Sequence, residues 1–199
     1  MSQRGRTVRT RDPRRNILIL GEGLSEYVYF RRLQSRFPHM RIISQNGKGG
    51  GSYDNLITTV RKSADIRGLD VDKGDVLAIV ADVDEHTPDD IAEAMEACSR
   101  EHIGFYISNI DFEVWLLMHF EDITRWMEKN ELAERLSDHL GGPYDKGEGI
   151  AADDAMVDDA VRRGLRDIPV PEGAVGRCLA GDRSRTTVHL LVGGLSDYA

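Results

Sequence analysis

The hydrophobic pattern of the chain alternates between short apolar runs and longer segments with helical periodicity. Such short runs are typical of strands buried on both faces of a parallel sheet, and they cover residues 16–20, 40–45, 76–81 and 103–108. The segments between them have helical spacing or helix caps, and they cover residues 26–37, 53–68 and 87–102. Alternating strands and helices predict an α/β fold with a mostly parallel central sheet flanked by helices.

The second half of the chain is predicted to be mainly helical. Residues 111–140 form one long segment with helical character, which Gly141, Gly142 and Pro143 stop. Residues 151–168 and 184–198 predict two further helices. No segment has the composition of a linker, so we expect residues 16–199 to form a single domain with a helical C-terminal part, preceded by a basic flexible tail over residues 1–15.

Composition points to a cytoplasmic protein without a membrane partner. The chain has 199 residues, of which 40% are hydrophobic and 30% charged, as in soluble globular domains. No window approaches the roughly 18 consecutive apolar residues of a membrane helix, and the N-terminus lacks the apolar core of a secretory signal. The two cysteines, Cys98 and Cys178, lie far apart, which indicates packed, reduced thiols.

Charge is distributed unevenly along the chain. Residues 1–15 carry six arginines and one aspartate, a formal charge of +5, which leaves −13 for the remainder of a chain whose net charge is −8. The acidic body argues against a general affinity for nucleic acid. The arginine arm, which ends with Arg14 and Arg15, either contacts phosphates of a substrate or is only a solubilising tail.

Acidic residues follow two of the predicted strands. Glu22 stands between two glycines after the first strand, and Asp82 and Asp84 follow the strand over residues 76–81. Ligands of α/β proteins collect at the carboxyl ends of the strands, so these acids would converge there if the strands are neighbours. Three hard oxygen ligands suit Mg²⁺ or Mn²⁺. The alternatives are a turn, a helix cap or an exposed salt bridge.

Several stretches of the chain resemble the RloB family, bacterial proteins whose genes lie near restriction–modification and anti-phage loci. The matching stretches are ILILGEGLSEYVYFRRL, VLAIVADVDEH, ISNIDFEVWLLMHF, YDKGE and RTTVHLLVGGL. The chain departs from the family pattern at Ile110 and Asp111, where proline commonly follows the asparagine, and at Gly21, where a cysteine or apolar residue is frequent. The resemblance implies a topoisomerase–primase (TOPRIM)-like fold.

The resemblance also implies a metal-dependent, nuclease-like site. Glu22 would serve in acid–base work or metal binding, and Asp82 and Asp84 would hold Mg²⁺. The resemblance draws attention, without fixing their roles, to further residues in the matching motifs: Glu26, Asn109, Glu113, His119 and Lys146.

Each of these further residues has a structural alternative. Glu26 is either a substrate contact or a favourable acid in the first turn of a helix, and Asn109 is either a substrate contact or a helix cap. Glu113 lies among apolar residues, where a carboxylate is costly to bury unless it is paired, so it is either catalytic or part of a buried ion pair. His119 is either a general acid or phosphate contact, or a hydrogen-bonded core histidine. Lys146 either offsets charge on a reacting oxygen or is simply solvated.

The expected activity is Mg²⁺- or Mn²⁺-dependent cleavage of phosphodiester bonds in RNA or DNA, as part of anti-phage defence. Nucleic acid is therefore the expected partner. The alternative is a non-catalytic TOPRIM-like module that binds a nucleotide or nucleic acid and regulates a neighbouring defence protein.

Overall fold

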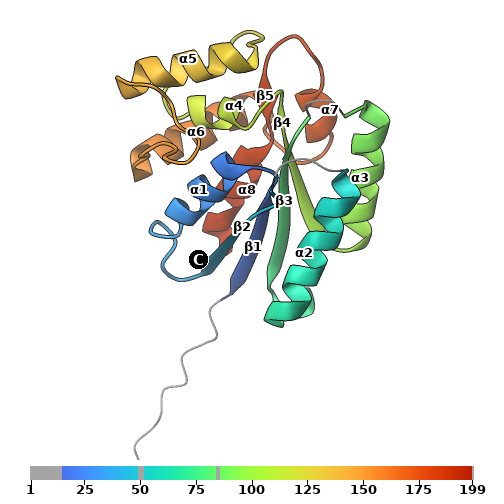
Figure 1. The fold of residues 1–199 in the computed structure, drawn as a ribbon. Helices are drawn as coiled ribbons and strands as arrows, with labels where there is room; N and C mark the ends of the chain where they lie inside the picture. Colours follow the sequence, from blue (N-terminus) through green and yellow to red (C-terminus); the bar gives the residue numbers. More distant parts are fainter. Residues whose placement is uncertain (1–14, 49–51, 84–85, 199) are drawn as a thin grey trace, which may run out of the picture.

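The computed structural model of the chain describes residues 15–48, 52–83 and 86–198. Its centre is a five-stranded sheet in the order β2-β1-β3-β4-β5 (Figure 1). The strands are β1 (Asn16–Gly21), β2 (Arg41–Asn46), β3 (Val76–Asp82), β4 (Ile103–Asn109) and β5 (Arg185–Thr186). The first four run parallel, and β5 pairs antiparallel with the carboxyl end of β4. The predicted mostly parallel α/β architecture is therefore confirmed.

Helices cover both faces of the sheet (Figure 1). One face carries α1 (Leu24–Leu33), α4 (Glu113–Leu117), α5 (Lys129–Leu140), α6 (Asp154–Asp167) and α8 (Val188–Gly194). The other face carries α2 (Tyr53–Arg67), α3 (Pro88–Arg100) and α7 (Ala174–Cys178).

Strand β1 supplies side chains to both hydrophobic cores. Ile17 and Ile19 pack with the first set of helices, and Leu18 and Leu20 pack with the second set. All four side chains are fully buried. This burial on both faces is the reason that the strand has an unbroken apolar run, as the sequence predicted.

The long helix expected over residues 111–140 was a wrong prediction. Helix α4 ends at Leu117, and α5 begins only at Lys129. The intervening segment contains no glycine or proline, but distant side chains bind its backbone. Arg163 donates to the carbonyl oxygen of Met118 at 2.7 Å, and Ser184 accepts from the backbone N–H of Met127 at 2.9 Å. These tertiary hydrogen bonds replace the helical ones.

The helix expected over residues 184–198 begins later than predicted. Arg185 and Thr186 form β5 instead, and α8 starts at Val188. The hydroxyls of two threonines hold this segment against β4: Thr187 Oγ1 accepts from the Ile107 N–H at 2.8 Å, and Thr186 Oγ1 lies 2.9 Å from Ser108 Oγ. Helix α7 was not predicted either.

Both cysteines are buried inside the core that α2, α3 and α7 share with the sheet. They are free thiols. Burial raises the pKa of Cys98 and of Cys178 to about 12. Within the described residues, no helix has the length and apolar character needed to cross a membrane.

The contact between α6 and α8 depends on a glycine. A Cβ atom at Gly164 would overlap the His189 ring, which is fully buried. We expect Gly164→Ala to lower the free energy of unfolding by about 1–3 kcal/mol, because the ring has no room to move. Gly176 in α7 is the control, since a Cβ there meets no atom within 4 Å. Gly176→Ala should raise the free energy of unfolding by about 0.5 kcal/mol.

Urea denaturation of the two variants beside the wild type measures both effects. Equal changes for the two glycines would contradict the role given to Gly164.

Candidate functional site

The carboxyl ends of β1 and β3 bring two acidic residues together. The backbone N–H of Glu22 donates to the Val80 carbonyl at 3.0 Å, which extends the pairing of the two strands by one residue. The Glu22 carboxylate then turns back, and its Oε2 accepts from the Asp82 N–H at 3.1 Å. The predicted third member of this group, Asp84, lies outside the described residues.

Glu26 lies beneath this strand end, on the first turn of α1. Its side chain is only 2% exposed, and its Oε1 accepts from the Gly23 N–H at 3.2 Å. The absence of a side chain at Gly21 makes room for it, because a Cβ there would overlap the Glu26 side chain. Burial raises the pKa of Glu26 to about 7, and the charges of Glu113 and Glu22 act in the same direction.

A second pair of carboxylates follows β4. Glu113 Oε1 accepts from Ser25 Oγ at 2.8 Å and from the Tyr144 hydroxyl at 2.9 Å. Lys146 Nζ lies 3.3 Å from the same Oε1 and 3.8 Å from Oδ2 of Asp111. Lys146 therefore bridges two acids that are themselves almost fully buried.

The two acids of this pair differ in protonation. Burial raises the pKa of Asp111 to about 7, assisted by the interaction with Glu113. Burial also opposes ionisation of Glu113, but its interactions with Asp111 and Lys146 outweigh that cost and lower its pKa to about 2. In mildly acidic solution the pair thus carries one negative charge and one proton between its two carboxyl groups.

Asp82 lies among the other acids. Burial raises its pKa well above the ordinary aspartate value, and the charges of Glu26 and Asp111 add to that effect. Its Oδ1 is buried without a hydrogen-bond partner, and so is Oε2 of Glu113. Two unsatisfied carboxylate oxygens and a set of hard oxygen donors fit Mg²⁺ or Mn²⁺ better than zinc. In the part of the chain that the structure describes, however, no three acidic, imidazole or thiol side chains are already gathered around a common metal position.

The comparison with protein families gives one result. The model of RloB-like proteins matches residues 17–195. The chain belongs to the RloB-like family. Searches of curated proteins and of solved structures found no match.

Two other predicted residues of this RloB-like chain have internal partners. His119 is 3% exposed, and its Nδ1 lies 3.0 Å from the Trp115 carbonyl oxygen while its Nε2 lies 3.1 Å from the Tyr29 hydroxyl. Burial lowers the pKa of His119 to about 4, so the ring is neutral, as expected for a core histidine. Asn109 is also buried, and its Nδ2 donates to the Cys178 carbonyl at 3.0 Å, which ties β4 to α7.

Arg15, one of the two predicted arginine contacts, does not lie at this edge. Arg15 precedes β1, so the strand separates it from Glu22 by roughly 20 Å at about 3.3 Å per residue. Its carbonyl accepts from the Arg41 N–H at the start of β2. Arg14 lies outside the described residues. The structure therefore groups Glu22, Asp82 and Glu26 with Glu113 and Lys146, but not with Arg15.

The RloB-like site contains residues that the sequence analysis did not select. Asp111 was noted only as a departure from the family pattern, although it lies two residues before Glu113. Ser25 and Tyr144 both bind Glu113, from α1 and from the segment after α5. The sequence signal for these two residues was their place in the matching stretches, with Ser25 directly before Glu26 and Tyr144 two residues before Lys146. Their contacts with Glu113 join distant parts of the chain, so the sequence alone did not show them.

The raised pKa of Glu26 predicts a pH-dependent cost of burial. The folded chain keeps a proton on Glu26 up to a pH of about 7, whereas the ordinary glutamate pKa is 4.5, so stability is lost as the pH rises through this window. Glu26→Gln retains the acceptor for Gly23 and cannot ionise. We expect it to raise the free energy of unfolding by on the order of 2 kcal/mol at pH 8 and to have little effect near pH 4.5.

Urea denaturation in chelator at both pH values measures this difference. Glu93→Gln, an exposed position on α3, serves as the control and should change stability at neither pH. If Glu26→Gln had the same effect at both pH values, ionisation of Glu26 would not be the cause.

Proposed function

We propose that this RloB-like chain is a Mg²⁺- or Mn²⁺-dependent nuclease-like enzyme with a TOPRIM-like active edge, which cleaves phosphodiester bonds of RNA or DNA in anti-phage defence. One observation carries the proposal: buried and half-buried carboxylates that follow three neighbouring strands gather at one edge of the sheet, where a lysine contacts two of them. They are Glu22, Glu26, Asp82, Asp111 and Glu113, with Lys146. Stability alone gives no reason for this arrangement, because buried like charges raise the free energy of the fold.

Glu22, Asp82 and Asp84 are the residues that would hold the divalent ion. When bound, the ion supplies positive charge for the phosphate oxygens and lowers the pKa of a coordinated water. The unsatisfied Oδ1 of Asp82 supports its assignment as a ligand. Glu22 Oε2 is already held by the Asp82 N–H, which keeps the two carboxylates in one place.

Lys146 would offset negative charge in the reaction, and the acids beside it would transfer protons and position the lysine. Burial disfavours the charged form of Lys146, but the charges of Glu113 and Asp111 outweigh this and raise its pKa, so the ammonium group persists. It can offset charge on a leaving oxygen. Asp111, with a pKa of about 7, can accept or release a proton in neutral solution. Glu113, held by Ser25 and Tyr144, positions Lys146.

A non-catalytic role is the second candidate. It is favoured by the lack of a ready three-ligand metal group among the described residues and by the net charge of −8. In that case the same edge would bind a nucleotide or nucleic acid and regulate a partner protein of a defence system.

Labelled RNA and DNA, incubated with the purified chain and Mg²⁺, Mn²⁺ or chelator, separate the two candidates. We expect metal-dependent cleavage, and Asp82→Asn should reduce its rate by roughly 100-fold or more, the scale of losing one electrostatic stabiliser. Asp89→Asn, an exposed position at the start of α3, should cleave like the wild type.

Cleavage that persists in chelator, or that Asp82→Asn leaves unchanged, would contradict the enzyme proposal. Metal binding by calorimetry without cleavage of either nucleic acid would favour the regulatory module.

A further inference from the structure

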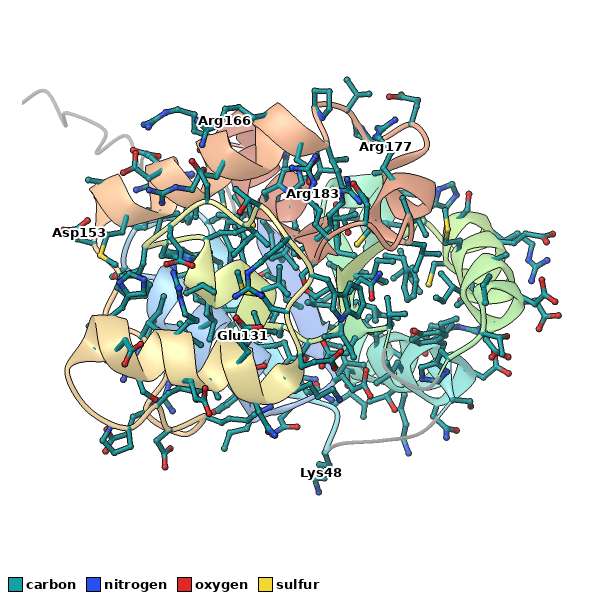
Figure 2. The ribbon with its side chains drawn as sticks, turned by 90° about the horizontal axis from the view of Figure 1, so that it is seen from above. Lys48, Glu131, Asp153, Arg166, Arg177 and Arg183 are labelled. Atoms are coloured by element: carbon teal, nitrogen blue, oxygen red, sulfur yellow. The ribbon has the colours of Figure 1, made fainter. Side chains whose placement is uncertain are left out.

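A polar cavity lies near the carboxyl end of β4. Its volume is about 250 Å³, and α6, the segment after α4 and residues 183–186 line it. Four arginines contribute to its walls: Arg163, Arg166, Arg183 and Arg185. In the view from above, Arg166 and Arg183 lie on one side of the molecule, opposite Lys48 (Figure 2). No residue of the carboxylate site lines this cavity.

The arginines of the cavity outnumber the acids that neutralise them. Arg163 and Arg166 share Asp122, with the Arg163 Nε 3.4 Å from Asp122 Oδ1. Arg183 and Arg185 share Asp167, at 3.0 Å and 2.9 Å. The third acid, Asp182, does not line the cavity; it binds Arg185 and lies 4.0 Å from the Arg183 Nε. These seven side chains keep a formal excess of one positive charge, in a chain whose net charge is −8.

The Arg183 guanidinium has a donor without a hydrogen bond. Its Nε is buried, and the Asp182 Oδ2 lies 4.0 Å away, which is an ion-pair distance but too long for a hydrogen bond. A buried donor without an acceptor is unfavourable. The whole side chain is nevertheless 36% exposed, so a ligand in the cavity can reach the guanidinium, and the side chain has to turn for the Nε to meet it. An oxygen of an anion would satisfy this donor while compensating the excess charge.

Arg163 and Arg185 have firmer internal contacts. Arg163 donates to the Met118 and Phe120 carbonyl oxygens, which shapes the segment after α4. Arg185 is 8% exposed and lies opposite Asn109 in the β4–β5 pairing. These two arginines form a fixed wall, whereas Arg166, with a side chain 61% exposed, and Arg183 can turn toward a ligand.

We propose that this arginine cavity binds a phosphate group. A guanidinium group can donate two parallel N–H hydrogen bonds to the oxygens of a tetrahedral phosphate group, and each phosphate oxygen can accept more than one hydrogen bond. The cavity is smaller than the roughly 300 Å³ at which pockets for drug-sized ligands begin, so it suits one phosphate and the start of the group attached to it. That phosphate belongs either to a free phosphate compound or to a nucleic acid strand, and binding does not require the proposed metal chemistry.

Binding measurements in chelator test the proposal with the full chain. Inorganic phosphate and pyrophosphate are titrated by calorimetry, and labelled single-stranded oligonucleotides with a 5′-phosphate or a 5′-hydroxyl are titrated by fluorescence anisotropy. We expect binding of at least one of these probes, weakened about ten-fold or more by Arg183→Gln, which removes charge-assisted hydrogen bonds.

Arg162→Gln is the matched control. It removes the same charge from an arginine of α6 that is 67% exposed, pairs with Asp159 and does not line the cavity. It should leave affinity within about two-fold of the wild type, because a solvent-screened charge contributes little. Thermal unfolding confirms that each variant is folded, and Arg166→Gln replaces Arg183→Gln if the latter is not.

The pattern of probes identifies the source of the phosphate. Binding of phosphate or pyrophosphate in calorimetry, without oligonucleotide binding, indicates a free phosphate compound. Tighter binding of the 5′-phosphorylated strand than of the 5′-hydroxyl strand indicates a terminal phosphate. Equal binding of both strands indicates a backbone phosphate. Each supports the proposal if Arg183→Gln weakens it and Arg162→Gln does not. No binding of any probe, or binding that Arg183→Gln weakens no more than Arg162→Gln does, overturns it. Because the titrations are done in chelator, these outcomes do not depend on the metal-dependent cleavage that tests the nuclease proposal.

Discussion

Repulsion between buried carboxylates is the constraint on which the arrangement of this molecule depends. The parallel ladder fixes the ends of β1, β3 and β4 side by side, so the acids that follow these strands cannot move apart. In a poorly hydrated position each negative charge makes the next ionisation harder. The fold accommodates this conflict in two ways, by keeping protons on Glu26 and Asp111 up to about pH 7 and by placing Lys146 against Glu113.

The contacts around Glu113 show how the fold stabilises a buried negative charge. Ser25 comes from α1, Tyr144 and Lys146 come from the segment after α5, and all three meet at one carboxylate oxygen. The polar centre therefore links the sheet to two parts of the helical layer. A change at this oxygen would be felt in segments that are more than a hundred residues apart in the chain.

The sequence predicted the elements whose signals are local. Apolar runs predicted the buried strands, and a capping threonine predicted the start of α3. The structure has this cap, because Thr87 Oγ1 accepts from the Asp90 N–H. The break between α4 and α5 could not be predicted, because Arg163 and Ser184, far along the chain, create it. Strand topology alone was enough to place Glu22 and Asp82 at one edge of the sheet. The roles of His119 and Asp111 depend on contacts with distant residues, so the sequence left His119 open and did not single out Asp111.

The deep burial of the two cysteines has a practical consequence for chemical labelling. With a pKa of about 12, each thiol is a thiolate in roughly one molecule in 10⁵ at pH 7, and only the thiolate reacts readily with maleimides or oxidants. A cysteine engineered on the surface would consequently react far faster than the native pair. A fluorophore or spin label can then be attached at a chosen point without first removing Cys98 and Cys178 from the core that they help to fill.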